Sequence, residues 1–295
     1  MHPRHAAFFA VAIVVMMTSL ASASPYAATI VYGDSLSDNG NLFAAIGYPP
    51  PPYWNGRFSN GPVAVDQLAT SLHSPLLDFA YGGATTGLGD IADGSTQTTV
   101  GAFGLPGMLL QVGGSLGSIT PIAPTSLFVV WGGPNDYFSG GTVPTAVADL
   151  VTIVGELQEV GATHILVPGM PDLGLTPAFY GNAQATAFSV AFNQALVANL
   201  PKGVTYFDTF SFFDKIVANP GAYGFTDVTD PCFNGSTVCN NPNQYFFWDD
   251  LHPTTAVDHL LAAQFGNAVP EPSTLLMLGT SVAGLAGVLR RRITK

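Results

Sequence analysis

Residues 30–42 read Ile-Val-Tyr-Gly-Asp-Ser-Leu-Ser-Asp-Asn-Gly-Asn-Leu, an apolar and partly β-branched run that stops abruptly at Gly33-Asp34-Ser35. The run predicts a buried strand, and the break predicts a turn that presents Ser35 at a sheet edge and at the start of a helix. A backbone N–H at a helix start lacks an intrahelical acceptor, so it favours negative charge that develops nearby. The stretch is therefore typical of a serine nucleophile, and equally of ordinary turn and N-cap chemistry.

Strand-like and helix-like segments alternate through the rest of the chain. Such alternation predicts a parallel sheet with helices on both faces, and ligands then bind beyond the C-terminal ends of the strands. Ser35, Gly83 and Asn135 each follow one of the apolar runs, so we expect them at one edge of the sheet. Further apolar runs occupy residues 76–81, 127–131, 165–167 and 204–207, and helical patterns occupy residues 62–72, 145–160, 183–200 and 254–265.

Two segments do not fit this alternation. Residues 84–126 include a glycine-rich part, 87–117, with little periodicity, which predicts a long excursion without regular structure. Residues 47–61 contain four consecutive prolines followed by Tyr53 and Trp54, so they form neither a helix nor a central strand. We expect a stiff aromatic loop that starts close to Ser35 and either shapes the mouth of a pocket or merely connects two elements.

Both ends of the chain carry apolar runs. Arg4, the apolar residues 6–20 and the small residues 21–23 predict a signal peptide over residues 1–23, with a membrane anchor as the alternative. A second apolar run, 275–289, precedes three arginines, which predicts a short membrane helix with its basic end in the cytoplasm. Residues 24–268 between these segments are expected to form the enzyme domain.

The C-terminal residues 269–295 resemble the PEP-CTERM sorting signal, because Pro270-Glu271-Pro272, an apolar helix and a basic end follow in that order. In certain Gram-negative bacteria this signal is recognised by an exosortase. The resemblance implies signal peptidase and exosortase as processing partners, and transient or permanent attachment to the inner membrane through the C-terminal helix. It also implies delivery to the cell surface or extracellular matrix, with a plain anchor as the alternative.

Charge and cysteine content limit the possible partners. Residues 24–268 carry three basic side chains against eighteen acidic ones, a balance that repels nucleic acid. Cys232 and Cys239 lie in a loop rich in Pro, Asn and Gly, and in an exported chain this predicts a local disulfide. Loop closure by that disulfide contributes at most about 2.5 kcal/mol. Two cysteines without clustered histidines do not predict a zinc site.

A serine nucleophile needs a base, and His252 is the best candidate. It lies in the stretch Asp249-Asp250-Leu251-His252-Pro253, where Asp249 can fold back and accept a hydrogen bond from the imidazole Nδ1–H. That contact would fix the tautomer and leave Nε2 to take the serine proton. The other histidines fit less well, because they lie in the signal peptide, beside a turn, at the start of a strand or on a helix: His2, His5, His73, His164 and His259.

Four ordered segments together resemble the GDSL, or SGNH, hydrolases. They are Gly33-Asp34-Ser35-Leu36-Ser37-Asp38, Asp78-Phe79-Ala80-Tyr81-Gly82-Gly83-Ala84, Gly133-Pro134-Asn135-Asp136 and Asp249 to Pro253. Asp78 stands where the family usually has Asn. The resemblance spans about residues 29–265. It implies a flavodoxin-like, three-layer α/β/α fold with a central, mainly parallel five-stranded sheet.

The same resemblance implies a catalytic triad of Ser35, His252 and Asp249. It also implies an oxyanion hole made of the Ser35 and Gly83 backbone N–H groups and the Asn135 side-chain amide, with no cofactor and no metal. The expected activity is that of an exported serine ester hydrolase acting through an acyl-enzyme on Ser35. An acyltransferase with the same triad and a non-catalytic surface or matrix protein are the alternatives. Lipids, short-chain esters and O-acylated glycans remain open as substrates.

Overall fold

The computed structural model describes residues 26–269. The predicted signal peptide and the apolar run at 275–289 lie outside these residues. Within the described part of the chain, none of the helices has the length and apolar character needed to cross a membrane.

A parallel sheet of five strands forms the centre of the fold, in the order β2-β1-β3-β4-β5. This is the flavodoxin-like strand order, and the predicted fold class is confirmed. The predicted runs at 127–131 and 204–207 are strands over their whole length, whereas in the run at 76–81 only the first three residues form a strand. The strands are β1 (Thr29–Gly33), β2 (Leu76–Asp78), β3 (Leu127–Trp131), β4 (His164–Pro168) and β5 (Val204–Phe207).

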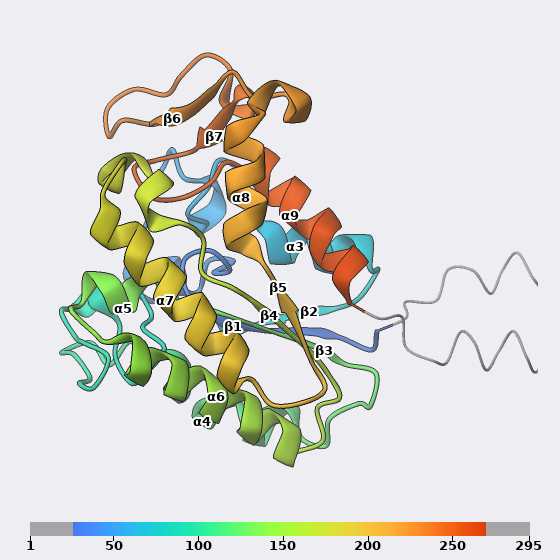
Figure 1. Ribbon diagram of the computed structural model, residues 1–295. Helices are drawn as coiled ribbons and strands as arrows, with labels where there is room; N and C mark the ends of the chain where they lie inside the picture. Colours follow the sequence, from blue (N-terminus) through green and yellow to red (C-terminus); the bar gives the residue numbers. More distant parts are fainter. Residues whose placement is uncertain (1–25, 270–295) are drawn as a thin grey trace, which may run out of the picture.

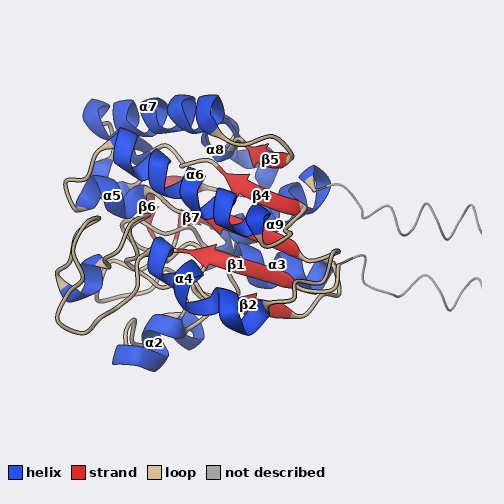
Figure 2. Cartoon of the chain, turned by 90° about the horizontal axis from the view of Figure 1, so that it is seen from below, coloured by secondary structure: helices blue, strands red, loops and turns tan. Residues whose placement is uncertain are grey.

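Helices cover both faces of the sheet, as Figures 1 and 2 show. One face is covered by α3 (Ala64–Ser71), α8 (Thr209–Ala218) and α9 (Thr255–Ala268), and the other by α4 (Met108–Ile119), α6 (Val143–Glu159) and α7 (Ala183–Asn199). Two short helices, α2 (Asn41–Ile46) and α5 (Pro134–Phe138), follow β1 and β3 at the carboxyl edge. Short 3-10 turns lie at Trp54–Gly56, Ile91–Asp93, Leu173–Leu175, Pro177–Phe179, Pro220–Tyr223 and Pro242–Gln244.

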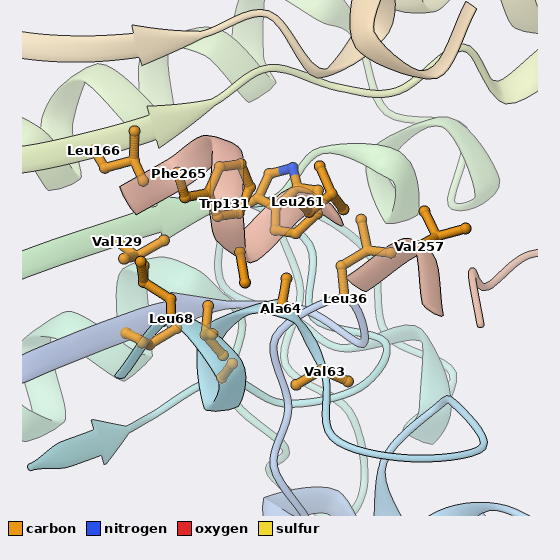
Figure 3. Close-up of a cluster of buried hydrophobic side chains, with 14 of the residues drawn as sticks. Leu36, Val63, Ala64, Leu68, Val129, Trp131, Leu166, Val257, Leu261 and Phe265 are labelled. Carbon is orange, nitrogen blue, oxygen red and sulfur yellow. The ribbon is translucent and has the colours of Figure 1, made fainter. Parts of the chain in front are cut away.

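All residues of the central strands β1 and β3 are buried. Successive side chains of a strand point to opposite faces of the sheet, so each of these strands contributes to both layers of the core. Val31 and Trp131 pack with α3, α8 and α9, whereas Tyr32 and Phe128 pack with α4, α6 and α7. Figure 3 shows the first of these clusters, in which Leu36 lies among side chains of α3 and α9. The residue after Ser35 is therefore anchored in the core.

The excursion predicted for residues 84–126 contains the twelve-residue helix α4, so that prediction was wrong in part. Gly113, Gly114 and Gly117 lower the helix propensity of the segment, but burial of one helix face against the sheet outweighs this cost. The sequence also gave no indication of a second, two-stranded sheet of β6 (Asp227–Pro231) and β7 (Tyr245–Phe247), which lies beside α8 (Figure 1).

The two ends of the described chain lie at the edge of the sheet opposite the carboxyl ends of the strands (Figure 2). Tyr26 precedes β1, and Val269 follows α9; both are buried in the same hydrophobic cluster. Val269 is therefore part of the core, and the expected domain boundary at residue 268 stays a prediction.

Candidate active site

Ser35 lies in a tight turn after β1 rather than at the start of a helix, which differs from the sequence-based expectation. The N–H groups of Ser37 and Asp38 both donate to the Asp34 carbonyl, and α2 begins six residues after Ser35. The Asp38 carboxylate is fully buried and accepts four backbone N–H groups at 2.6–3.1 Å. The donors are Gly40, Asn41, Leu42 and Gly82. Asp38 thus ties the serine turn to the turn that carries Gly83.

A side chain of helix α4 holds the end of β1, just before Ser35. Gln111 of α4 accepts a hydrogen bond from the Gly33 N–H at 3.0 Å and donates one to the Gly33 carbonyl at 2.9 Å. Both backbone groups of the last residue of β1 are thereby satisfied by one buried amide. The sequence offered no signal for this contact, because 78 residues separate the partners.

His252 lies in a loop that Asp249 folds upon itself. One carboxylate oxygen of Asp249, Oδ1, accepts the backbone N–H groups of Leu251 and His252 at 2.8 and 2.7 Å. The N–H of Trp248 donates to the His252 carbonyl at 2.7 Å. These short-range bonds fix the imidazole beside the carboxylate three residues upstream.

The structure brings Ser35, His252 and Asp249 into one hydrogen-bonded chain. The distance from Ser35 Oγ to His252 Nε2 is 2.8 Å, and His252 Nδ1 lies 2.8 and 2.9 Å from the two Asp249 oxygens. With Nδ1 protonated, the imidazole donates to Asp249 and accepts from the serine hydroxyl. Burial raises the pKa of Asp249, but the charge and hydrogen bonds of His252 and a hydrogen bond from Tyr53 outweigh burial and keep that pKa below its usual value. Asp249 is therefore ionised at neutral pH.

Segment 57–61 braces the histidine loop from a distant part of the chain. The Phe58 ring lies 4.9 Å from the His252 imidazole, centroid to centroid. Ser59 Oγ donates to the Pro253 carbonyl at 3.0 Å, and the Asn60 side chain accepts the Thr255 N–H at 2.9 Å. The aromatic loop that was expected near Ser35 thus contacts the imidazole directly.

Three hydrogen-bond donors belong to residues that line the cavity at Ser35: the backbone N–H groups of Ser35 and Gly83 and the side-chain amide of Asn135. Within residues 26–269 no protein group accepts from the backbone N–H of Ser35 or Gly83. The Asn135 side-chain amide uses one hydrogen to donate to the Ala84 carbonyl at 2.9 Å, which leaves its second hydrogen available. All three residues line the same cavity as His252.

Gly83 is required by its geometry. Its φ of +97° lies in the left-handed region, and a Cβ at this position would come within 2.3 Å of the Asp90 carboxylate. Asp90 is fully buried, and its Oδ2 has no hydrogen-bond partner in the described residues. Burial raises the pKa of Asp90 to about 8, so this carboxyl is mainly neutral at pH 7 and adds little negative charge beside Gly83.

The cavity above these residues has a volume of about 530 Å³ and a mainly apolar lining. Its polar side chains include those of Ser35, Asn135, Asp172, Thr176 and His252. The apolar side chains come from the serine turn, α2, the aromatic loop, α5, the turn after β4, α8 and the histidine loop. They include Leu36, Leu42, Ile46, Phe58, Phe138, Leu173, Phe213, Phe247 and Leu251.

The remaining candidates from the sequence lie elsewhere or have structural contacts. His164 begins β4 at the opposite edge of the sheet, His73 follows α3, and His259 on α9 contacts Gln67. Cys232 and Cys239 form the predicted disulfide. In the described part of the chain, no group of three or more His, Cys, Asp or Glu side chains is placed to hold a metal ion. Sequence reasoning missed Gln111 and the contact between Tyr53 and Asp249.

Known proteins resemble this chain in sequence and in fold. A family model described as GDSL-like Lipase/Acylhydrolase matches residues 30–265, and a PEP-CTERM protein-sorting motif matches residues 268–292. A thermolabile hemolysin from Vibrio parahaemolyticus is 28% identical over 79% of this chain and 61% of its own length. A phosphatidylcholine-sterol acyltransferase from Aeromonas hydrophila is 28% identical over 77% of this chain and 71% of its own length.

A solved structure described as a GDSL-like lipase from Parabacteroides merdae aligns with a TM-score of 0.50. It covers 82% of this chain and 95% of its own length, and at 15% identity it supports the fold alone. This chain spans 51% and 61% of the length of two curated relatives that it matches, so their whole activities do not transfer directly. The family model covers most of the chain, however, and the chain belongs to the GDSL-like lipase/acylhydrolase family.

Proposed function

We propose that the chain is an exported serine ester hydrolase in which Ser35 is the nucleophile, His252 the general base and Asp249 the residue that orients the base. One observation carries this proposal: the hydrogen-bonded chain from Asp249 through His252 reaches Ser35 Oγ at the wall of a mainly apolar cavity. Gly83 and Asn135, which carry the expected oxyanion donors, line the same cavity.

In the proposed reaction, Ser35 Oγ attacks the ester carbonyl carbon while His252 Nε2 takes the hydroxyl proton. The tetrahedral intermediate then collapses, and the alcohol leaves with the proton from Nε2. Water attacks the acyl-enzyme and gives a proton to Nε2, which returns it to Ser35 Oγ as the acid departs. Asp249 stabilises the imidazolium at each step without taking a proton.

The oxyanion would be stabilised by the N–H groups of Ser35 and Gly83 and by the Asn135 amide. Donors of this kind, aimed at the oxygen on which charge develops, each lower the barrier by roughly 3 kcal/mol. The mainly apolar lining supports an ester with an apolar acyl chain as the substrate. A series of chromogenic esters of increasing chain length, measured beside an O-acetylated glycan, tests this substrate class.

The direct test of the nucleophile compares wild-type protein with Ser35→Ala. We expect wild-type protein to react covalently with a fluorophosphonate probe, and peptide mass spectrometry to place the adduct on Ser35. Ser35→Ala should lose both labelling and ester hydrolysis, whereas Ser118→Ala, at an exposed serine of α4 away from the cavity, should keep both. Labelling of another residue, or hydrolysis by Ser35→Ala, would contradict the assignment.

An acyltransferase reaction is the second candidate, because the same cavity could exclude water and admit an alcohol. A relative named phosphatidylcholine-sterol acyltransferase supports this candidate. Both reactions would use the same acyl-enzyme, so only the acceptor distinguishes them. Product analysis in the presence of a sterol or a simple alcohol separates the two: a large excess of transfer over hydrolysis would favour the transferase.

The sorting motif indicates export and sorting to the cell envelope. We further propose that residues 1–23 are a signal peptide and that the C-terminal segment holds the protein in the inner membrane before an exosortase cuts near Pro270-Glu271-Pro272. The described chain ends at the sheet edge opposite the cavity, which supports a cut that leaves the active site intact. Mass spectrometry of native protein tests this point, since retention of Arg290 would indicate a permanent anchor.

A further inference from the structure

The aromatic loop contains a residue that touches the acid of the proposed triad. Tyr53 directly follows the four prolines at 49–52, and its hydroxyl donates a hydrogen bond of 2.7 Å to Asp249 Oδ2. We propose that Tyr53 is a positioning residue, which holds the Asp249 carboxylate in the orientation that His252 requires. This inference rests on the proposed function for its kinetic part, but its structural part can be tested without substrate.

The hydrogen bonds of Asp249 explain why the carboxylate needs a further partner. Oδ1 accepts two backbone N–H groups from its own loop, as well as the imidazole. Among residues 26–269, Oδ2 accepts only from the imidazole Nδ1–H, at 2.8 Å, and from the Tyr53 hydroxyl. Without the Tyr53 hydroxyl, His252 would be the one described partner left to Oδ2, and the carboxylate would be less firmly held against rotation about its Cβ–Cγ bond.

The Tyr53 ring is itself held from three parts of the chain. Its centroid lies 6.0 Å from that of Phe58, 5.7 Å from that of Phe233 and 6.1 Å from that of Trp248, and each pair is close to edge-to-face. Such arrangements are favourable for aromatic pairs. Phe58 also contacts the His252 ring, so Tyr53 and the imidazole share one aromatic neighbour. The hydroxyl is therefore aimed at Asp249 by packing and not by the hydrogen bond alone.

The hydroxyl stays protonated and so can always donate. Burial raises the pKa of Tyr53 well above its ordinary value, and the negative charge of Asp249 raises it further. The other titratable groups that face this cluster are Asp34, Asp250 and Tyr48. A substitution at position 53 that keeps the ring leaves all three in place.

The test is Tyr53→Phe, which removes the hydroxyl and keeps the ring among its three neighbours. We expect kcat to fall about tenfold, as for loss of a hydrogen bond to a charged group. KM should stay unchanged, because Tyr53 does not line the cavity. Tyr180→Phe, at an exposed tyrosine, is the matched control and should behave as wild type.

Two further measurements separate positioning from a general structural effect. In an Asp249→Ala background, Tyr53→Phe should cause no further loss, because its effect passes through the absent carboxylate. In NMR spectra recorded without substrate, the low-field Nδ1–H resonance of His252 should shift in Tyr53→Phe and not in Tyr180→Phe. Wild-type kinetics, an unmoved resonance, or an equal loss in both backgrounds would overturn the inference. Absence of esterase activity in wild-type protein would instead contradict the proposed function and leave the NMR test valid.

Discussion

The serine turn (residues 33–42) and the histidine loop (residues 247–253) meet in one hydrogen-bonded chain, but they are held in place differently. The serine turn is fixed mainly by carboxylates of its own sequence, because Asp34 and Asp38 accept backbone N–H groups two to four residues away. The histidine loop depends in addition on residues almost 200 positions earlier, since Tyr53 bonds Asp249, and Ser59 bonds the Pro253 carbonyl.

This difference separates what local sequence determines from what the fold must supply. The turn of the proposed nucleophile carries most of its own hydrogen-bond acceptors, and the fold adds Gln111 at Gly33 and Asp78 at Asn39. The proposed base and its acid are held in addition by aromatic and polar groups that reach them only when the sheet has formed. Changes in the serine turn should therefore affect stability and activity together, whereas changes around the histidine loop should affect activity more than stability.

The largest effect is expected from Asp249→Asn in the histidine loop. The amide would disturb the hydrogen bond to Nδ1 and favour the wrong imidazole tautomer, so kcat should fall by about ten-thousandfold while the protein remains folded. Asp250→Asn is the matched control, because the side chain of Asp250 is exposed and only its carbonyl accepts a hydrogen bond, from Ala178. Steady-state kinetics on a chromogenic ester check both variants, and a severe loss in Asp250→Asn alone would reassign the acid.

A smaller effect, on stability as well as on activity, is expected from Asp38→Ala in the serine turn. Four backbone N–H groups, two of them buried, lose their acceptor, which should lower the free energy of unfolding by about 3 kcal/mol and also lower kcat. Asp208→Ala removes a carboxylate that caps α8 through Ser211, away from the cavity, and should cost about 1 kcal/mol with kcat unchanged. Denaturant titration measures both variants. Equal losses of stability would mean that Asp38 does not hold the turn.

The strands could be predicted because their sequences are continuous apolar runs that end in Gly, Pro or Asp. Leu127–Trp131 is such a run, it is buried on both faces, and no other element explains its composition as well. The residues brought together at the carboxyl edge then follow from the rule for parallel sheets. Ser35, Gly83 and Asn135 were placed at one edge in this way, although 100 residues separate the first from the last.

Helix α4 and its contact with strand β1 could not be predicted from a continuous pattern of apolar residues. Two of its four buried positions are polar, Gln111 and Ser115, so the apolar stripe that indicates a helix is interrupted. Those polar residues are satisfied by partners in β1: Gln111 bonds Gly33, and Ser115 Oγ lies 2.8 Å from the Tyr32 hydroxyl. Tyr53 was missed because its partner Asp249 lies 196 positions away in the sequence.

The smallest effect is expected from the disulfide, which lies behind the histidine loop. The disulfide closes a short loop that is hydrogen-bonded to the histidine loop. The Cys232 N–H donates to the Phe247 carbonyl, and the Phe233 N–H donates to the Trp248 carbonyl. Closure of so short a loop restricts the unfolded chain little, so replacing both cysteines by serine should lower the free energy of unfolding by about 2.5 kcal/mol at most. Differential scanning calorimetry of the double variant measures this loss.

Activity should respond even less than stability to loss of the disulfide. Phe233 stacks on Trp248 and touches Tyr53, but Tyr53 keeps its contacts with Phe58 and Trp248 when the loop loosens. We therefore expect kcat of the double serine variant to stay within about threefold of wild type. This change is smaller than the fall of about tenfold expected when Tyr53→Phe removes the hydrogen bond to Asp249. A tenfold or greater loss of kcat in a folded variant would show that the disulfide loop, and not Phe58 with Trp248, holds Tyr53 against Asp249. The histidine loop would then depend on a third distant segment, which would widen its contrast with the serine turn.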